Sequence, residues 1–152
     1  MARMTWLQQV AHALTIAGSA CLSAGLIVLS FMAFADPQGA AVHYAGVAAS
    51  ASAVPYVIAM GVRDLALGLA TMVLAFKVPA AMRFFAPTVL VVPIGDVVTT
   101  LTHGTTLLQA APHILGTAGV AVFVIATWLD PALDFPNGLT EPFAKDANRD
   151  ST

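Results

Sequence analysis

Charged side chains are scarce in this sequence of 152 residues. Lys, Arg, Asp and Glu make up 9% of it, whereas soluble domains carry about 25%. Hydrophobic residues account for 59%, and the mean hydropathy is +0.85. So few polar side chains do not cover a globule in water, which excludes a soluble domain. The six basic residues form no cluster, which excludes a nucleic-acid-binding surface.

Cysteine and the usual ligand patterns are scarce as well. The single cysteine, Cys21, has no partner in the chain for a disulfide, so the fold does not depend on the redox compartment. No spacing of His, Cys, Asp and Glu is typical of a metal or haem site, and no glycine-rich phosphate loop is present. The sequence therefore predicts neither a metal nor a cofactor.

Long hydrophobic runs are what the sequence has instead. Four of them are long enough to cross a hydrocarbon core as helices, which takes about 20 residues. They lie at about residues 7–34, 54–76, 84–108 and 113–129 and lack the alternation of barrel strands. We therefore predict an all-α fold, an antiparallel four-helix membrane bundle in residues 1–130. A polar cytoplasmic tail follows in residues 131–152.

Basic residues predict how the bundle is oriented. Arg3 precedes the first run, Lys77 and Arg83 lie between the second and third, and Lys145 and Arg149 lie in the tail. The two connections on the opposite side contain no Lys or Arg. By the positive-inside rule we expect both termini in the cytoplasm, in a bacterial inner membrane or an internal membrane.

The connection at residues 35–53 is long for a helical bundle, where about 2–8 residues are usual. It contains His43 and Tyr44. Two interpretations are open: a lid or short interfacial helix over the end of the bundle, or an external loop.

Small residues suggest where helices approach closely. Ala17, Cys21 and Gly25 repeat every four positions, as do Ser19 and Ser23. Such stripes let membrane helices pack tightly. We expect the same packing role for Gly61, Gly68 and Gly116.

Ionisable residues interrupt the two middle runs. Arg63 and Asp64 lie near the centre of one run, and Asp96 lies in the middle of the next. An antiparallel hairpin places both aspartates at the same depth, where each charge costs about 2.5–3.5 kcal/mol on insertion scales and suggests a functional site. Because neighbouring helical residues point about 100° apart, we expect Arg63 to pair with Asp96 rather than with Asp64.

One arginine and two aspartates leave one carboxyl group unbalanced. Carboxyl groups in different environments supply one proton donor and one proton acceptor. The structural alternative is an ion pair that only locks the hairpin. We predict catalytic roles for Asp64, Asp96, Arg63 and His103, and substrate-binding roles for Thr99, Thr100, Tyr56 and Gln109.

The stretch GVRDLALGL at residues 61–69, followed by an aspartate and a His-Gly pair in the next run, resembles a known family. It is a family of small four-span membrane proteins of unknown function, loosely grouped with DoxX-like proteins. The resemblance implies a fold and a site but no activity. The positions that it marks are Gly61, Arg63, Asp64, Gly68, Asp96, His103 and Gly104.

These features favour a membrane-embedded enzyme that performs cofactor-free acid–base chemistry on a lipophilic small molecule. Epoxide opening, cyclisation and double-bond isomerisation all fit. The alternative is a proton-linked small transporter or an accessory subunit of a membrane redox complex, with the carboxylates as a relay. A transporter usually shows an internal repeat, which this sequence lacks. Besides the lipid bilayer and the substrate, a homo-oligomeric partner is compatible with the sequence.

Overall fold

The long apolar runs form helices. The structure, a computed structural model, describes residues 4–45, 50–102 and 106–134. Its elements are α1 (Trp6–Ala35), α2 (Pro37–Ala45), α3 (Val54–Lys77), the 3₁₀ turn η1 (Pro79–Ala81), α4 (Met82–Thr102), α5 (Leu107–Leu129) and the 3₁₀ turn η2 (Pro131–Leu133). Four helical segments, α1, α3, η1 with α4, and α5, are long and apolar enough to cross a membrane. The described residues contain no strand, and the prediction of an all-α membrane bundle is confirmed.

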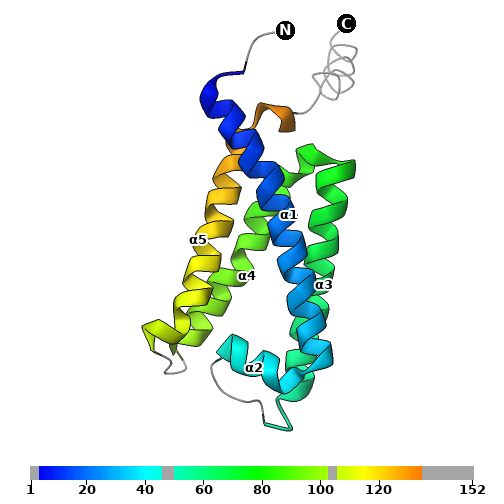
Figure 1. The fold of residues 1–152 in the computed structure, drawn as a ribbon, viewed down its shortest axis with the longest axis vertical. Coiled ribbons are helices and arrows are strands. Elements are labelled where there is room, and N and C mark those ends of the chain that lie inside the picture. The colour runs from blue at the N-terminus through cyan, green and yellow to red at the C-terminus, as the bar shows by residue number, and fades with distance from the viewer. Residues whose placement is uncertain (1–3, 46–49, 103–105, 135–152) are drawn as a thin grey trace, which may run out of the picture.

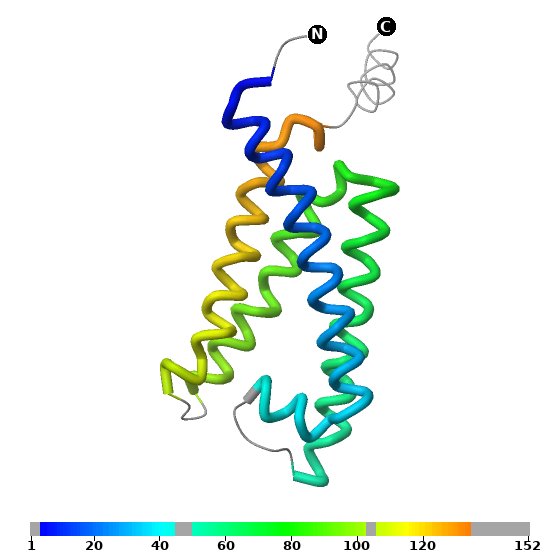
Figure 2. Tube along the Cα trace, in the orientation of Figure 1, coloured from blue at the N-terminus to red at the C-terminus, as the bar shows by residue number. Residues whose placement is uncertain are grey.

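The long helices pack as two pairs rather than around a hairpin of α3 and α4. Helix α1 lies mainly against α3, and α4 lies mainly against α5, whereas α3 and α4 make few contacts. Figures 1 and 2 show the pairs close together near the chain termini and further apart at the opposite end. Helix α2 lies across this wider end (Figure 1).

Glycines bring α1 and α3 together. The Ser23 hydroxyl donates a hydrogen bond of 2.9 Å to the carbonyl oxygen of Gly68. A methyl group on Gly68 would lie 3.1 Å from the carbonyl oxygen of Ser23, and one on Gly61 would lie 2.8 Å from the Cβ of Ala33. The predicted packing role of these two glycines is confirmed, because neither position has room for a side chain.

Of the two stripes of small residues predicted on α1, one is buried and the other is exposed. Thr15, Ser19 and Ser23 are buried, whereas Ala17, Cys21 and Gly25 are exposed. Thr15 and Ser19 donate their hydroxyl hydrogens to carbonyl oxygens four residues earlier, which satisfies these polar groups inside the helix. Gly116 also has open space around it.

Two connections differ from the expected boundaries. Helix α5 begins at Leu107 rather than at residue 113, because Thr106 and Gln109 form a capping box there, and α4 ends at Thr102 rather than at residue 108. Residues 37–45 form helix α2, so the helical interpretation of the long connection is the one that the structure bears out.

Candidate functional site

Asp64 is the most completely bound carboxylate of the candidate site. It lies on α3 with its side chain 2% exposed. Arg63 donates to its Oδ1 from Nη2 at 2.9 Å and from Nε at 3.0 Å, and Tyr44 donates to its Oδ2 at 2.7 Å. Both oxygens are therefore satisfied, and the guanidinium balances the negative charge.

This geometry corrects the expected partner of Arg63. Its guanidinium binds the neighbouring Asp64 closely, and its Nη1 lies 3.6 Å from Oδ1 of Asp96. Consecutive residues pair here because the arginine side chain is long enough to fold back toward its neighbour. Arg63 thereby joins α3 to α4, and the structure brings the three predicted residues together.

Asp96 on α4 is held more loosely than Asp64. Its side chain is 27% exposed, and its distance to Arg63 exceeds the usual length of a hydrogen bond. The Thr100 hydroxyl donates to the backbone carbonyl of Asp96 at 2.7 Å, so this threonine binds the backbone rather than the carboxylate.

Tyr44 reaches the site from α2. Burial raises the pKa of its phenol well above the ordinary value of about 10, and the hydrogen bond to the Asp64 carboxylate raises this pKa further. The phenol is therefore protonated at neutral pH and acts as a donor. Nε2 of His113, on α5, contacts the backbone carbonyl oxygen of Tyr44, which ties α2 to α5.

A cavity of about 220 Å³ lies between the helices at this site. Its polar lining comes from Arg63, Asp64, Asp96, Tyr44 and His113, together with His43. Leucine and valine side chains of all four long helices line the rest. Its volume is below the range of about 300–1,000 Å³ that is usual for drug-sized ligands. The cavity therefore suits a small molecule, or one end of a larger one.

The predicted substrate-binding residues do not line this cavity. Tyr56 is 74% exposed on α3, two turns before Asp64, and Gln109 caps the N-terminus of α5. Thr99 is exposed on α4, and Thr100 donates its hydroxyl to its own helix. Their substrate-binding roles stay a prediction, and a stripe of polar residues on one helix does not show which of them satisfy its backbone.

His103 and Gly104, which the sequence also singled out, lie outside the described residues. The structure brings His43, Tyr44 and His113 to the cavity. The aromatic pair His43–Tyr44 is visible in the long connection, but no periodicity there shows that it folds back over the bundle. Among the described residues, no group of three or more His, Cys, Asp or Glu is placed to hold a metal ion.

Comparisons with known proteins give one result that bears on this site. The comparisons with curated proteins and with solved structures returned no match. A family model described as a domain of unknown function (DUF4267) matches residues 23–129, which is more than half of the chain. This segment includes every residue of the polar lining. The chain therefore belongs to the DUF4267 family, a family of domains of unknown function.

Proposed function

We propose that this protein is a membrane-embedded enzyme that performs cofactor-free acid–base chemistry on a small lipophilic molecule. Asp96 is the group that takes up and returns a proton. The supporting observation is the contrast between the two carboxylates. Asp64 has both oxygens bound and is almost fully buried, whereas Asp96 lines the cavity, is 27% exposed and lies 3.6 Å from Arg63. A proton acceptor needs access to its substrate in this way.

Double-bond isomerisation fits this contrast better than epoxide opening. Epoxide opening by two carboxyl groups requires one of them to give a proton to the epoxide oxygen. Asp64 accepts hydrogen bonds on both oxygens and is almost fully buried, so it has no proton to give and no oxygen left to activate water. Isomerisation requires a single carboxylate that moves a proton between two carbons, as in ketosteroid isomerases. Asp64 is then a positioning residue that holds Arg63.

The substrate class that suits this reaction is a β,γ-unsaturated carbonyl compound with an apolar body. The Asp96 carboxylate removes a proton from the carbon between the carbonyl and the alkene, and the electrons of that bond move to the carbonyl oxygen. The Arg63 guanidinium stabilises the resulting dienolate through its remaining N–H groups. Asp96 then returns the proton to the γ-carbon, which yields the conjugated product and regenerates the carboxylate.

The test is turnover of lipophilic β,γ-unsaturated ketones by the purified protein in deuterated water. We expect the parent protein to form a conjugated product, which is detected by its ultraviolet absorbance. In Asp96→Asn we expect the turnover rate to fall by about 100- to 10,000-fold. Asp36→Asn is the matched control, because Asp36 caps α2 through the Gly39 amide and does not line this cavity. Equal rates in Asp96→Asn and the parent protein, or no turnover of any ketone, would contradict the isomerase.

A proton relay is the second candidate function, either for a transporter or for a membrane redox complex. The supporting observation is the polar series from Asp96 through Arg63 and Asp64 to Tyr44 on α2. Its test uses protein in liposomes that contain a pH-sensitive dye. Proton uptake that disappears in Asp96→Asn, without turnover of any ketone, would favour the relay.

We also propose an orientation for the bundle in the membrane and a relationship of the chain to DoxX-like proteins. Helix α1 begins and α5 ends at the end of the bundle where α3 joins α4 (Figure 1). Lys77 is the last residue of α3, and Arg83 lies in the first turn of α4. This arrangement supports cytoplasmic termini, with the candidate site in the opposite half of the membrane. The proposed relationship to DoxX-like proteins rests on the sequence at residues 61–69, which contains Gly61, Gly68 and the Arg–Asp pair.

A further inference from the structure

A second and larger cavity, of about 650 Å³, lies between α1 and α3 at the end of the bundle near the termini. Its volume is within the range of about 300–1,000 Å³ that is usual for small-molecule sites. Most of its lining is apolar, and Ile16 and Phe76 at its walls are 59% and 81% exposed. The cavity therefore opens on the lipid-facing side of the bundle.

The ionisable side chains that line this cavity are His12 and Asp130, which form a pair. Nδ1 of His12 lies 3.0 Å from Oδ2 and 3.3 Å from Oδ1 of Asp130. Because an ionised carboxylate only accepts hydrogen bonds, Nδ1 carries the hydrogen. Nε2, on the other side of the ring, has no hydrogen-bond partner among the described residues. The imidazole is 43% exposed and thus accessible from the cavity.

Asp130 is fixed more firmly than an ordinary surface carboxylate. It is fully buried at the C-terminal end of α5, and its Oδ1 also accepts the backbone N–H of Ala132 at 2.9 Å. Arg83 donates to the backbone carbonyl oxygens of Thr127 and Asp130, which fixes the helix end itself. A buried carboxylate that orients a histidine in this way leaves the second ring nitrogen for a ligand.

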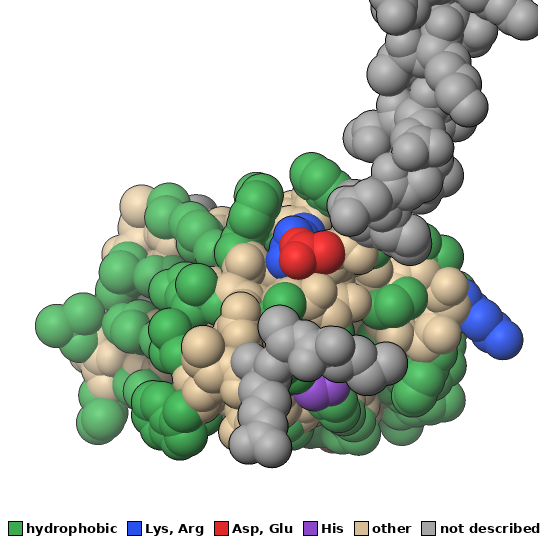
Figure 3. Space-filling model, turned by 90° about the horizontal axis from the view of Figure 1, so that it is seen from above, with side chains coloured by type: hydrophobic (Ala, Val, Ile, Leu, Met, Phe, Trp, Pro, Cys, Tyr) green, Lys and Arg blue, Asp and Glu red, His purple; other side chains and the backbone are tan. Residues whose placement is uncertain are grey.

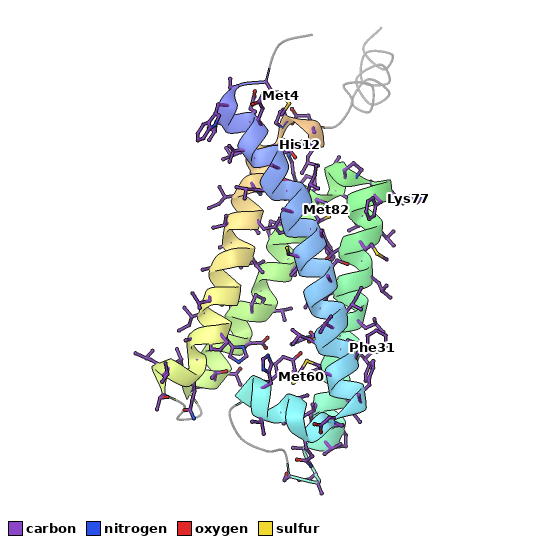
Figure 4. The ribbon with its side chains drawn as sticks, viewed as in Figure 1. Met4, His12, Phe31, Met60, Lys77 and Met82 are labelled. Atoms are coloured by element: carbon purple, nitrogen blue, oxygen red, sulfur yellow. The ribbon has the colours of Figure 1, made fainter. Side chains whose placement is uncertain are left out.

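Among the described residues, the charged side chains at this end are Lys77, Arg83, Asp130 and Asp134, and Arg83 pairs with Asp134. Lys77 follows the cavity-lining Phe76, is exposed and has no ion pair among the described residues. Figure 4 labels His12, Met82 and Lys77 at this end of the bundle. Figure 3 shows the same end, with acidic and basic side chains in contact near its middle and hydrophobic side chains around them. A ligand in this cavity meets an apolar wall and, at one end, the imidazole of His12.

We propose that the cavity between α1 and α3 binds a long-chain carboxylic acid, with its chain along the apolar wall and its carboxyl group at Nε2 of His12. A carboxyl group fits both states of the imidazole. As an acid it donates to the nitrogen lone pair, and as a carboxylate it accepts from the N–H. A single chain also suits the cavity volume better than a two-chain phospholipid.

The test uses the full-length protein in phosphatidylcholine nanodiscs, with bound cis-parinaric acid displaced by palmitic acid. We expect palmitic acid to compete better than hexadecanol by about ten-fold or more. Hexadecanol has the same chain but no charged group, so it cannot form the charge-assisted hydrogen bond to His12. Palmitic acid should also compete better than phosphatidylglycerol. We expect His12→Gln to weaken palmitic acid binding by about ten-fold or more. Equal competition by hexadecanol or phosphatidylglycerol would overturn the proposal.

Two variants separate binding from folding. His43→Gln is the matched control, because His43 lines the smaller cavity, and it should bind palmitic acid like the parent. Ala20→Phe fills the larger cavity from an exposed position and leaves the His12–Asp130 pair in place. It should abolish binding without lowering the melting temperature, so it tests the site even if His12→Gln does not fold. Unchanged affinity in Ala20→Phe would refute this location.

Discussion

At the scale of single residues, the two aspartates of the candidate site have opposite surroundings. Asp64 accepts hydrogen bonds from Arg63 and Tyr44 and is buried, so its loss leaves a guanidinium and a phenol without their acceptor. Asp96 is partly exposed and has a long contact with Arg63, so its loss removes little. The first residue holds the site together, and the second is available for chemistry.

The stabilities of Asp64→Asn and Asp96→Asn should therefore differ. Removing one partner of a buried pair costs about 3–5 kcal/mol, so we expect a large fall in the melting temperature of Asp64→Asn in detergent. For Asp96→Asn we expect a change within about 1 kcal/mol. Strong destabilisation of both variants would identify the site as a helix clamp and count against the proposed enzyme.

Because of Tyr44, we expect the folding stability of the protein to fall as the pH rises in the alkaline range. Its pKa is raised in the folded protein, so its stabilising contribution is complete below about pH 10, the unfolded value, and is lost as the pH rises through the folded value. We expect the parent protein to lose more stability above pH 10 than Tyr44→Phe does. In Tyr56→Phe, where Tyr44 is the remaining tyrosine, phenolate absorbance should appear at higher pH in the folded protein than in denaturant. Coincident titrations would contradict the burial of this phenol.

At the scale of elements, the α1–α3 contact depends on the absence of two side chains. Gly61→Ala places a methyl group 2.8 Å from the Cβ of Ala33, and Gly68→Ala places one 3.1 Å from a backbone oxygen. Neither neighbour is the end of a flexible side chain, so the two helices must move apart.

We expect each of these substitutions to destabilise the protein by about 1–3 kcal/mol, as overpacking usually does. Gly119→Ala on α5 is the matched control, because open space surrounds that position. It should be neutral or stabilising, since alanine is the better helix former by about 1 kcal/mol. Equal melting temperatures for all three variants would show that α1 and α3 are not in close contact.

At the scale of the whole molecule, the bundle has two different ends. The end where α3 joins α4 has Lys77 and Arg83 at the adjoining helix ends, and the end covered by α2 has the candidate site. Orientation therefore decides from which side of the membrane the site is reached.

Labelling of single cysteines in intact cells tests the orientation. In a Cys21→Ser background, we expect a membrane-impermeant maleimide to label Ser50→Cys, in the connection before α3. Lys77→Cys should react only after the membrane is permeabilised. The reverse pattern would place the termini outside the cytoplasm.

Sequence and structure agree most closely where a property is local. The apolar runs predict the four long helices because the length of a helix across lipid is set by its own residues. Arg63, Asp64 and Asp96 were identifiable because charge inside an apolar run is costly wherever the chain folds. Gly61 and Gly68 were visible as small residues on one helix face.

The sequence by itself thus determined that this is an all-α membrane bundle with a polar site on its two middle runs. The tertiary structure alone decided that α1 pairs with α3, that Tyr44 binds Asp64, and that His12 meets Asp130. These contacts join residues far apart in the chain. They depend on how helices pack and how a long side chain turns, and neither follows from the periodicity of a single segment.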